Sequence, residues 1–272
     1  MRVGFIGLAA RGRRWRDGSS RVASRPRCGL AARRHWNPSP TPGPRPRGSP
    51  AELAAASDLV CLCVVGDDDV RQVLDGETGV LAGLAPGGVI AIHSTVHPDT
   101  CREIAEKAAA QGVSVVDAPV SGGEPAASAG TLLVMVGGDE EVVERVRPVF
   151  ATYADPIVHL GGVGAGQVAK ILNNLLFSAN LGAAMSALEL GEALGVPRQA
   201  LCEVITRGSA TSKALNSIAM FGGTLDNLAP IAGALLQKDC RHAASLADDA
   251  SAPQGAVFDA ADNALAIMNH PR

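Results

Sequence analysis

The chain has 272 residues, of which 47% are hydrophobic, 3% are aromatic and 31 are glycine. This length allows two domains with proper cores, and the composition is typical of a soluble α/β enzyme rich in small aliphatic residues. No continuous apolar run reaches the roughly 18 residues of a membrane span, no secretory signal is present, and the six scattered cysteines fit neither a metal site nor a disulfide framework. We therefore expect a cytoplasmic protein with no membrane partner and no metal.

The net charge of −3 conceals an uneven distribution. Residues 9–49 contain eleven arginines and one acidic residue, Asp17, whereas residues 51–272 contain 12 basic and 26 acidic residues, a net charge of −14 (12 − 26). A basic arm on an acidic body can indicate nucleic-acid binding. This arm has only Trp15 and Trp36 as aromatics, lacks lysine, and shows no helical or strand periodicity. Nucleic-acid binding is therefore a disfavoured hypothesis for this protein.

The N-terminal stretch begins as a dinucleotide-binding turn and then departs from one. The apolar strand at 3–6 runs into Gly7, and the spacing Gly7-x-Ala9-x-x-Gly12 is one methyl group away from G-x-G-x-x-G. That methyl would stand where the backbone must approach a pyrophosphate. The following prolines and arginines exclude a buried parallel strand. We expect residues 9–48 to be irregular.

From Ser49 onward, strands alternate with helices. Ser49 and Glu52 form a capping box with Pro50 between them, which opens a short helix. The apolar runs predict buried strands at 58–65, 87–95, 113–120, 131–138 and 156–162. The intervening sequence predicts helices at 67–74, 98–111 and 139–150, the last ended by Pro148. This order predicts an α/β fold with a doubly wound parallel sheet and an antiparallel edge.

After Gly164 the pattern becomes entirely helical. Residues 164–195 predict one helix of about 45 Å at 1.5 Å per residue, followed by helices at 197–207, 211–220, 229–249 and 254–267. The sequence thus predicts a Rossmann-like dinucleotide-binding domain at 1–163 and an all-helical substrate and dimerisation domain at 164–272. Because the long helix is apolar on most sides, we expect a second subunit to cover it, giving a homodimer or homotetramer.

Two polar residues interrupt the long apolar helix. Lys170 and Asn174 lie four positions apart, hence on one face. The lysine could simply extend to the surface along its aliphatic stem. If it is buried instead, its lowered pKa would let it transfer a proton near neutral pH while it polarises a carbonyl group.

A second candidate site is the turn Ser121-Gly122-Gly123, which follows the strand at 113–120. One hydroxyl and several unhindered backbone N–H groups at the carboxyl end of a strand can bind a carboxylate or phosphate. Taken alone, the three residues favour an ordinary glycine turn over a binding site.

Three motifs in order resemble one known family. "DAPVSGG…AGTLLVMVGG", "GAGQVAKILNN" and Lys238-Asp239 are similar to the β-hydroxyacid dehydrogenases, the 6-phosphogluconate dehydrogenase-like group that contains 3-hydroxyisobutyrate dehydrogenase and tartronate semialdehyde reductase. The similarity covers residues 1–8 and about 49–250. It implies an enzyme that uses NAD or NADP to move a hydride between nicotinamide and a small hydroxy acid or semialdehyde. Imine reductases and the non-catalytic chromatin-associated relatives lack the lysine, so Lys170 argues against both.

The resemblance also implies a role for each matching residue. Lys170 would be the general acid/base and Asn174 its partner, while Ser121, Gly122 and Gly123 would hold the substrate carboxylate. The cofactor would lie against Gly7, Leu8, Gly12, Val64, Val65, Thr95, Lys238 and Asp239, the last of which would also orient nearby groups.

Residues 9–48 depart from the family pattern. Their Arg-, Pro-, Gly-, Ala- and Ser-rich composition is what GC-rich coding DNA yields when read out of frame. The residue that would select NAD or NADP is not identifiable there. The second hypothesis is therefore a catalytically weak remnant that acts as a dimeric binding module.

Overall fold

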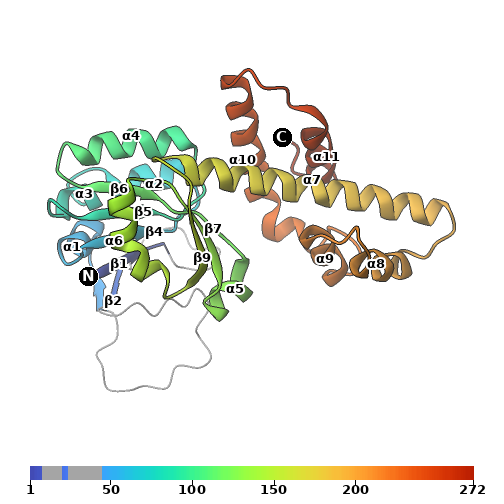
Figure 1. Ribbon diagram of the computed structural model, residues 1–272, viewed down its shortest axis with the longest axis horizontal. Coiled ribbons are helices and arrows are strands. Elements are labelled where there is room, and N and C mark those ends of the chain that lie inside the picture. The colour runs from blue at the N-terminus through green and yellow to red at the C-terminus, as the bar shows by residue number, and fades with distance from the viewer. Residues whose placement is uncertain (8–19, 24–44) are drawn as a thin grey trace. The chain divides into compact units, whose positions relative to one another are not determined.

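The computed structural model describes residues 1–7, 20–23 and 45–272 (Figure 1). The chain forms two compact units, Met1–Lys170 and Ile171–Arg272. Their border falls inside the long helix α7 (Ala165–Ala193), a few residues after the border between 163 and 164 expected from the sequence.

The first unit is organised by a six-stranded sheet with the order β3-β2-β1-β4-β5-β6. The last four strands in that order are parallel, which confirms the predicted sheet, whereas β2 is antiparallel to β1 and β3 is antiparallel to β2. The strands span β1 (Val3–Ile6), β2 (Ser20–Ala23), β3 (Arg45–Arg47), β4 (Leu59–Leu62), β5 (Val89–Ile92) and β6 (Ser114–Asp117).

Strands β2 and β3 lie in the segment 9–48, for which we expected no regular structure. That expectation considered only a buried parallel strand. In the structure β3 is an edge strand that pairs only with β2. An edge strand tolerates the missing N–H group of Pro46 better than a central strand would. Residues 8–19 and 24–44, which include the predicted cofactor residues Leu8 and Gly12, lie outside the described residues.

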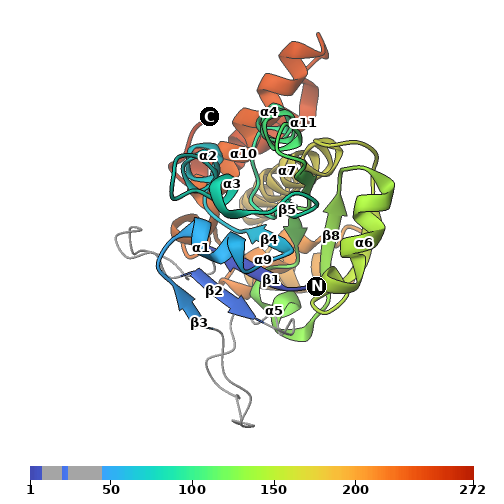
Figure 2. The same ribbon diagram turned by 90° about the vertical axis from the view of Figure 1, so that its left-hand side faces the viewer.

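Apolar side chains alternate between the two faces of the parallel strands. Val60, Leu62, Ile90 and Ile92 belong to one core, and their neighbours in sequence belong to another. The first core is covered by the helices α1 (Pro50–Ala55), α2 (Asp67–Leu74), α3 (Val80–Gly83) and α4 (Pro98–Ala109), which lie together on one face of the sheet (Figure 2). Burial on both faces explains why these strands read as continuous apolar runs.

The opposite face is covered by a second, three-stranded sheet and two helices. Its order is β7-β8-β9, with β7 antiparallel and β9 parallel to β8. These elements span β7 (Val120–Ser121), α5 (Gly123–Ala129), β8 (Leu132–Val136), α6 (Glu140–Phe150) and β9 (Ala154–His159). The sequence did not reveal that the strands divide into two sheets, nor did it predict α3 and α5.

Pro148 does not end α6 as expected, because the helix continues to Phe150. A proline removes the hydrogen bond to the carbonyl four residues earlier and crowds that carbonyl. Since only two residues follow Pro148, the disturbance is confined to the last turn.

The second unit is wholly helical, as predicted. It contains most of α7 together with α8 (Arg198–Arg207), α9 (Lys213–Met220), α10 (Ala229–Asp249) and α11 (Gly255–Ile267). Its core joins fully buried side chains of α7, among them Ile171, Leu181 and Leu188, to the inner faces of α10 and α11. The packing of an apolar face, more than helix propensity, stabilises helices of this kind.

Helix α7 is long and apolar enough to cross a membrane by length and composition alone, with a mean hydropathy of 1.3 over its most apolar window. Polar residues interrupt its apolar sequence, so it contains no continuous apolar run of membrane-spanning length. Interior helices of soluble proteins pass the same test, and α7 carries Lys170, Asn173 and Asn174 within its first half.

We predict that Gly182→Ala strongly destabilises the helical unit. A Cβ at Gly182 would lie 1.9 Å from the carbonyl oxygen of Ala260, so the backbones of α7 and α11 would have to separate. The expected loss in the free energy of unfolding is about 1–3 kcal/mol, measured by urea denaturation.

Gly191→Ala on the same helix is the matched control. Its Cβ would meet only the flexible end of Leu201, and both substitutions gain the same helix propensity. Equal stability of the two variants would contradict the interpretation of Gly182 as a close helix crossing.

Candidate active site

The carboxyl ends of three neighbouring parallel strands bring the predicted cofactor residues to one edge of the sheet. Gly7 follows β1, Val64 and Val65 follow β4, and Thr95 follows β5. The backbone N–H of Val64 donates to Ser94 Oγ over 2.8 Å, which fixes the two loops together. Val65 is 67% exposed and Thr95 is half-buried. This edge is where open α/β sheets bind dinucleotides.

The backbone conformation and the close packing at position 7 require glycine. Its φ is +97°, and a Cβ would lie 2.3 Å from the carbonyl oxygen of Cys63. The backbone therefore passes from β1 directly against the end of β4, as a nucleotide-binding turn needs. The described part of this edge thus fits NAD or NADP. Strand β2 runs antiparallel to β1, so its own carboxyl end points to the opposite edge.

The turn Ser121-Gly122-Gly123 lies at the junction of β7 and α5. Gly122 and Gly123 have φ of +128° and +65°, which side chains rarely adopt, and Gly122 caps α5 with no side-chain hydrogen bond. Ser121 and Gly122 are half-buried and Gly123 is exposed. The turn consequently presents a hydroxyl and glycine backbone at the start of a short helix.

Asn174 is held by a buried ion pair in the helical unit. Its Nδ2 donates to Asp239 Oδ2 over 2.5 Å, and Lys238 Nζ donates to Asp239 Oδ1 over 2.8 Å. Asp239 is only 2% exposed, so its carboxylate is a firm anchor for both groups. The structure therefore brings together three of the residues that the resemblance selected. Lys170 is half-buried one helical turn before Asn174.

Asp117 was not among the site residues predicted from the sequence. Its side chain is fully buried, and it accepts hydrogen bonds from the backbone N–H groups of Gly164 over 2.6 Å and Gln167 over 2.8 Å. Burial raises the pKa of this carboxyl group, and the backbone donors oppose that rise. An acidic residue at the end of an apolar strand was the available signal.

Gln167 was also missed. The fully buried side chain donates from Nε2 to the carbonyl of Ser94 over 2.8 Å and accepts at Oε1 from the N–H of Val96 over 3.2 Å. Gln167 therefore forms hydrogen bonds with the residues on both sides of Thr95. A lone glutamine in a helix gives no such signal in sequence.

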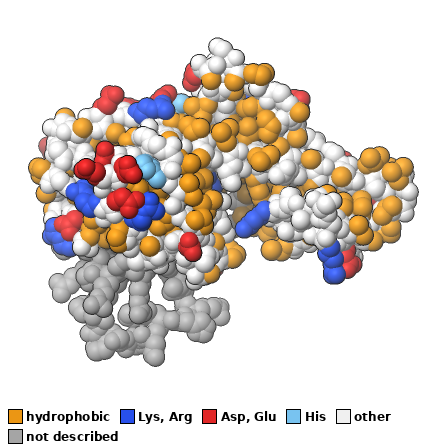
Figure 3. Space-filling model, viewed as in Figure 1, with side chains coloured by type: hydrophobic (Ala, Val, Ile, Leu, Met, Phe, Trp, Pro, Cys, Tyr) orange, Lys and Arg blue, Asp and Glu red, His pale blue; other side chains and the backbone are white. Residues whose placement is uncertain are grey.

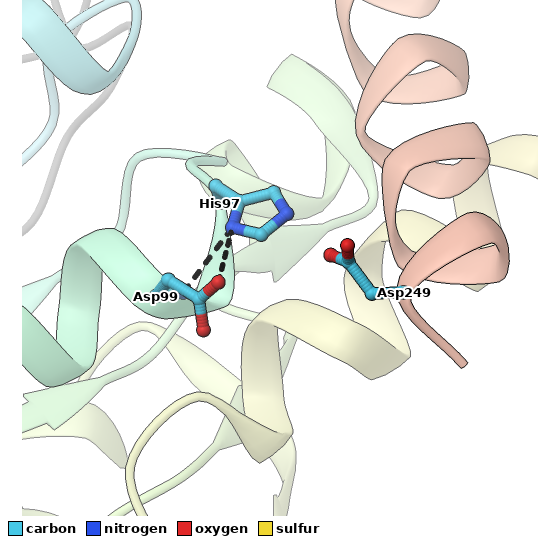
Figure 4. Close-up of side chains that lie close together, drawn as sticks. All are labelled: His97, Asp99 and Asp249. Atoms are coloured by element: carbon cyan, nitrogen blue, oxygen red, sulfur yellow. Dashed lines mark hydrogen bonds and ion pairs between the residues drawn. The ribbon is translucent and has the colours of Figure 1, made fainter.

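Two histidines near these loops have structural contacts. His93 is buried, with its ring nitrogens 2.6 Å from the carbonyl of Ala118 and 3.0 Å from the hydroxyl of Tyr153, and burial lowers its pKa. The ring of His97 accepts from the N–H of Asp99 over 3.3 Å and caps α4 (Figure 4). Neither contact calls for an acid–base role.

Two family models match the chain. Residues 31–161 match the NAD binding domain of 6-phosphogluconate dehydrogenase, and residues 164–267 match the NAD-binding domain of NADP-dependent 3-hydroxyisobutyrate dehydrogenase. The first match begins at 31, earlier than the position near 49 where we expected the similarity to resume, and it omits the stretch from Gly7 to Gly12.

Similar proteins agree with these matches. The 2-(hydroxymethyl)glutarate dehydrogenase of Eubacterium barkeri is 39% identical over 61% of this chain and 55% of its own length. The 3-hydroxyisobutyrate dehydrogenase of Pseudomonas aeruginosa is 39% identical over 62% of this chain and 56% of its own. The chain therefore aligns with just over half the length of these curated relatives. The structure of Mycobacterium tuberculosis 3-hydroxyisobutyrate dehydrogenase with L-serine has a TM-score of 0.69 at 32% identity, covering 81% of this chain and 78% of that one.

The fold and both matches define a protein of the NAD(P)-binding dehydrogenase class. Within that class, the chain belongs to the β-hydroxyacid dehydrogenase family, as its motifs indicated.

Proposed function

We propose that this protein is an NAD(P)-dependent oxidoreductase of the 3-hydroxyisobutyrate dehydrogenase type. It would transfer a hydride between nicotinamide and a small hydroxy acid or the matching semialdehyde. The observation that carries the proposal is the anchoring of Asn174 to buried Asp239, one helical turn from Lys170. Relatives named for small hydroxy acids support it, among them an NAD-dependent L-serine dehydrogenase.

Each residue group has a distinct part in this chemistry. When bound, the cofactor supplies or accepts the hydride. Lys170 donates a proton to the substrate oxygen during reduction and takes it back during oxidation. Asn174, whose amide nitrogen points to Asp239, holds the substrate oxygen or Lys170 in place. Gly7, Val64, Val65 and Thr95 would line the cofactor, and Leu8, Gly12 and Lys238 are assigned to it by the family resemblance alone.

Ser121, Gly122 and Gly123 are the proposed carboxylate site. Their hydroxyl and N–H groups can converge on two oxygens, and charge-assisted hydrogen bonds are about twice as strong as neutral ones. L-serine, the compound in the similar solved structure, carries a carboxylate beside a hydroxyl-bearing chain, which suits such a site.

The remnant hypothesis is the second candidate. It rests on Ala9 in the sequence of the nucleotide turn and on the start of the first family match at residue 31, whereas both family models and the similar dehydrogenases favour the enzyme. A chain of this kind would keep the helical unit and act as a dimeric binding module, without nicotinamide-dependent turnover. Absence of wild-type turnover in the assays below would favour it.

We also propose a homodimer or larger homo-oligomer built on α7. Leu172, Leu176 and Leu190 on α7, and Leu194 directly after its end, are each at least 54% exposed. Hydrophobic side chains are visible at the surface of the helical unit (Figure 3). An exposed apolar stripe of this length is typical of a protein interface.

A cytoplasmic location is proposed as well. The five described cysteines are free thiols, which suits a reducing compartment. Recovery of the protein in the membrane pellet after cell lysis would contradict this location.

We predict that Lys170→Met lowers kcat by about 10²–10⁴-fold, the usual contribution of general acid–base catalysis, with the fold unchanged. Asn174→Ala should lower it less. Steady-state oxidation of NADH and NADPH with glyoxylate measures both effects. Lys213→Met, an exposed lysine at the start of α9, is the control. Unchanged activity of Lys170→Met would overturn the assigned role.

A second prediction concerns the carboxylate site. Small semialdehyde acids should be reduced with at least about tenfold higher kcat/KM than their methyl esters, because an ester lacks the charge that the turn binds. Ser121→Ala should narrow this preference, whereas Ser128→Ala, on the exposed side of α5, should leave it intact. Equal rates with acid and ester would remove the carboxylate assignment.

The third prediction concerns assembly. Sedimentation equilibrium should give at least twice the 27.7 kDa mass of one chain, and the double change Leu190→Asp with Leu194→Asp should reduce it to one chain. Val204→Asp on α8, at a side chain that is 66% exposed, is the matched control. A monomeric wild-type protein would exclude the interface.

A further inference from the structure

We propose that Asp117 is a positioning residue for Lys170. Its carboxylate caps the first turn of α7 and thereby fixes the position of the second turn, which carries Lys170. This inference rests on the role proposed above for Lys170.

Helix α7 has no local N-terminal cap. The residues around its start read Leu160-Gly-Gly-Val-Gly-Ala-Gly166, so no side-chain oxygen is available to accept from the first backbone N–H groups. Asp117 supplies that acceptor from the end of β6, with Oδ1 on Gly164 and Oδ2 on Gln167. The cap thus comes from another element about fifty residues away.

The surroundings leave room for this carboxylate and for little else. A Cβ at Gly137 would lie 2.4 Å from Asp117 Oδ1, and a Cβ at Gly166 would lie 2.8 Å from Oδ2. Asp117 and Gly137 also exchange backbone hydrogen bonds of 3.0 and 2.8 Å. Three motifs identified in the sequence, at 117–123, 131–138 and 164–174, therefore meet at one side chain.

Gln167 extends the same connection to the cofactor edge. It accepts from Val96 and donates to Ser94, while Ser94 Oγ accepts from the N–H of Val64. The first turn of α7 is consequently tied to the loops after β4 and β5. Lys170 follows Gln167 by three residues, less than one helical turn. A shift of the first turn therefore moves Lys170 relative to the loops proposed to hold the nicotinamide, and small misplacements of a catalytic group are costly.

The test is a double-mutant cycle with Asp117→Asn and Lys170→Met, since the amide keeps the shape of the side chain but can accept with only one of its two atoms. Alone, Asp117→Asn should lower kcat by about 10–100-fold while KM and the dissociation constant of NADH, measured by fluorescence, stay within about twofold. In the Lys170→Met background it should have no further effect, because it acts through the lysine.

Asp139→Asn is the matched control. Asp139 is the exposed local N-cap of α6 and accepts from the N–H groups of Glu141 and Val142 over 3.0 and 3.2 Å. Its change also removes the charge of a helix cap and should leave kcat unaltered in both backgrounds. An effect of Asp117→Asn that persists in full in the Lys170→Met background would overturn the proposal, since it would show a merely structural role.

Hydrogen exchange provides a readout independent of activity. Asp117→Asn should raise amide exchange in residues 164–170 at least about tenfold over the rest of α7, whereas Asp139→Asn should not. Unchanged exchange there would overturn the capping role. A wild-type-like Lys170→Met enzyme would instead refute the proposed function, so the two failures are distinguishable.

Discussion

The buried carboxylate of Asp117 resolves a problem that the sequence of α7 creates. This helix of 29 residues starts inside the protein, after a glycine-rich stretch with no capping side chain. Unsatisfied backbone N–H groups in such a place cost about 1–3 kcal/mol each. Asp117 satisfies them from the end of β6, and Gly137 and Gly166 leave the space that its two oxygens occupy. The helix can then carry Lys170 and Asn174 at a defined position.

The parallel sheet supplies the other half of the arrangement. Because β1, β4 and β5 are parallel neighbours, their following residues necessarily meet at one edge. Gly7 allows the backbone to pass close to Cys63, and Ser94 joins the loops after β4 and β5. Gln167 then ties those loops to α7. The edge of the sheet proposed to bind the cofactor and the first turn of α7 are thus one connected hydrogen-bonded structure within the first unit.

The helical unit contributes a buried charge with two partners. The desolvation cost of Asp239 is offset by the hydrogen bonds that it accepts from Asn174 and Lys238, and loss of Lys238 would remove the ammonium group that pairs with this buried carboxylate. Its fixed position orients the carboxamide of Asn174. The close crossing of α7 and α11 at Gly182 holds the same helix on the opposite side of the core. Rigid support of this kind is what the proposed role of Asn174 requires.

Much of this protein was determined by sequence alone. Apolar runs fixed the buried strands, caps and periodicity fixed the helices, and α10 has the bounds 229–249 that its pattern predicted. The motifs also selected Asn174, Lys238 and Asp239, which the fold brings together. Local patterns carry this information because the spacing of apolar residues reflects the period of the element and the face that it buries.

Only the tertiary structure decided the rest. The division of the strands into two sheets, the antiparallel β2 and β3, and the roles of Asp117 and Gln167 all depend on contacts between residues far apart in the chain. An aspartate at the end of a strand looks the same in sequence whether it faces solvent or caps a helix fifty residues later. Its function is set by which backbone N–H groups the fold leaves without a partner, and that is known only when the chain has folded.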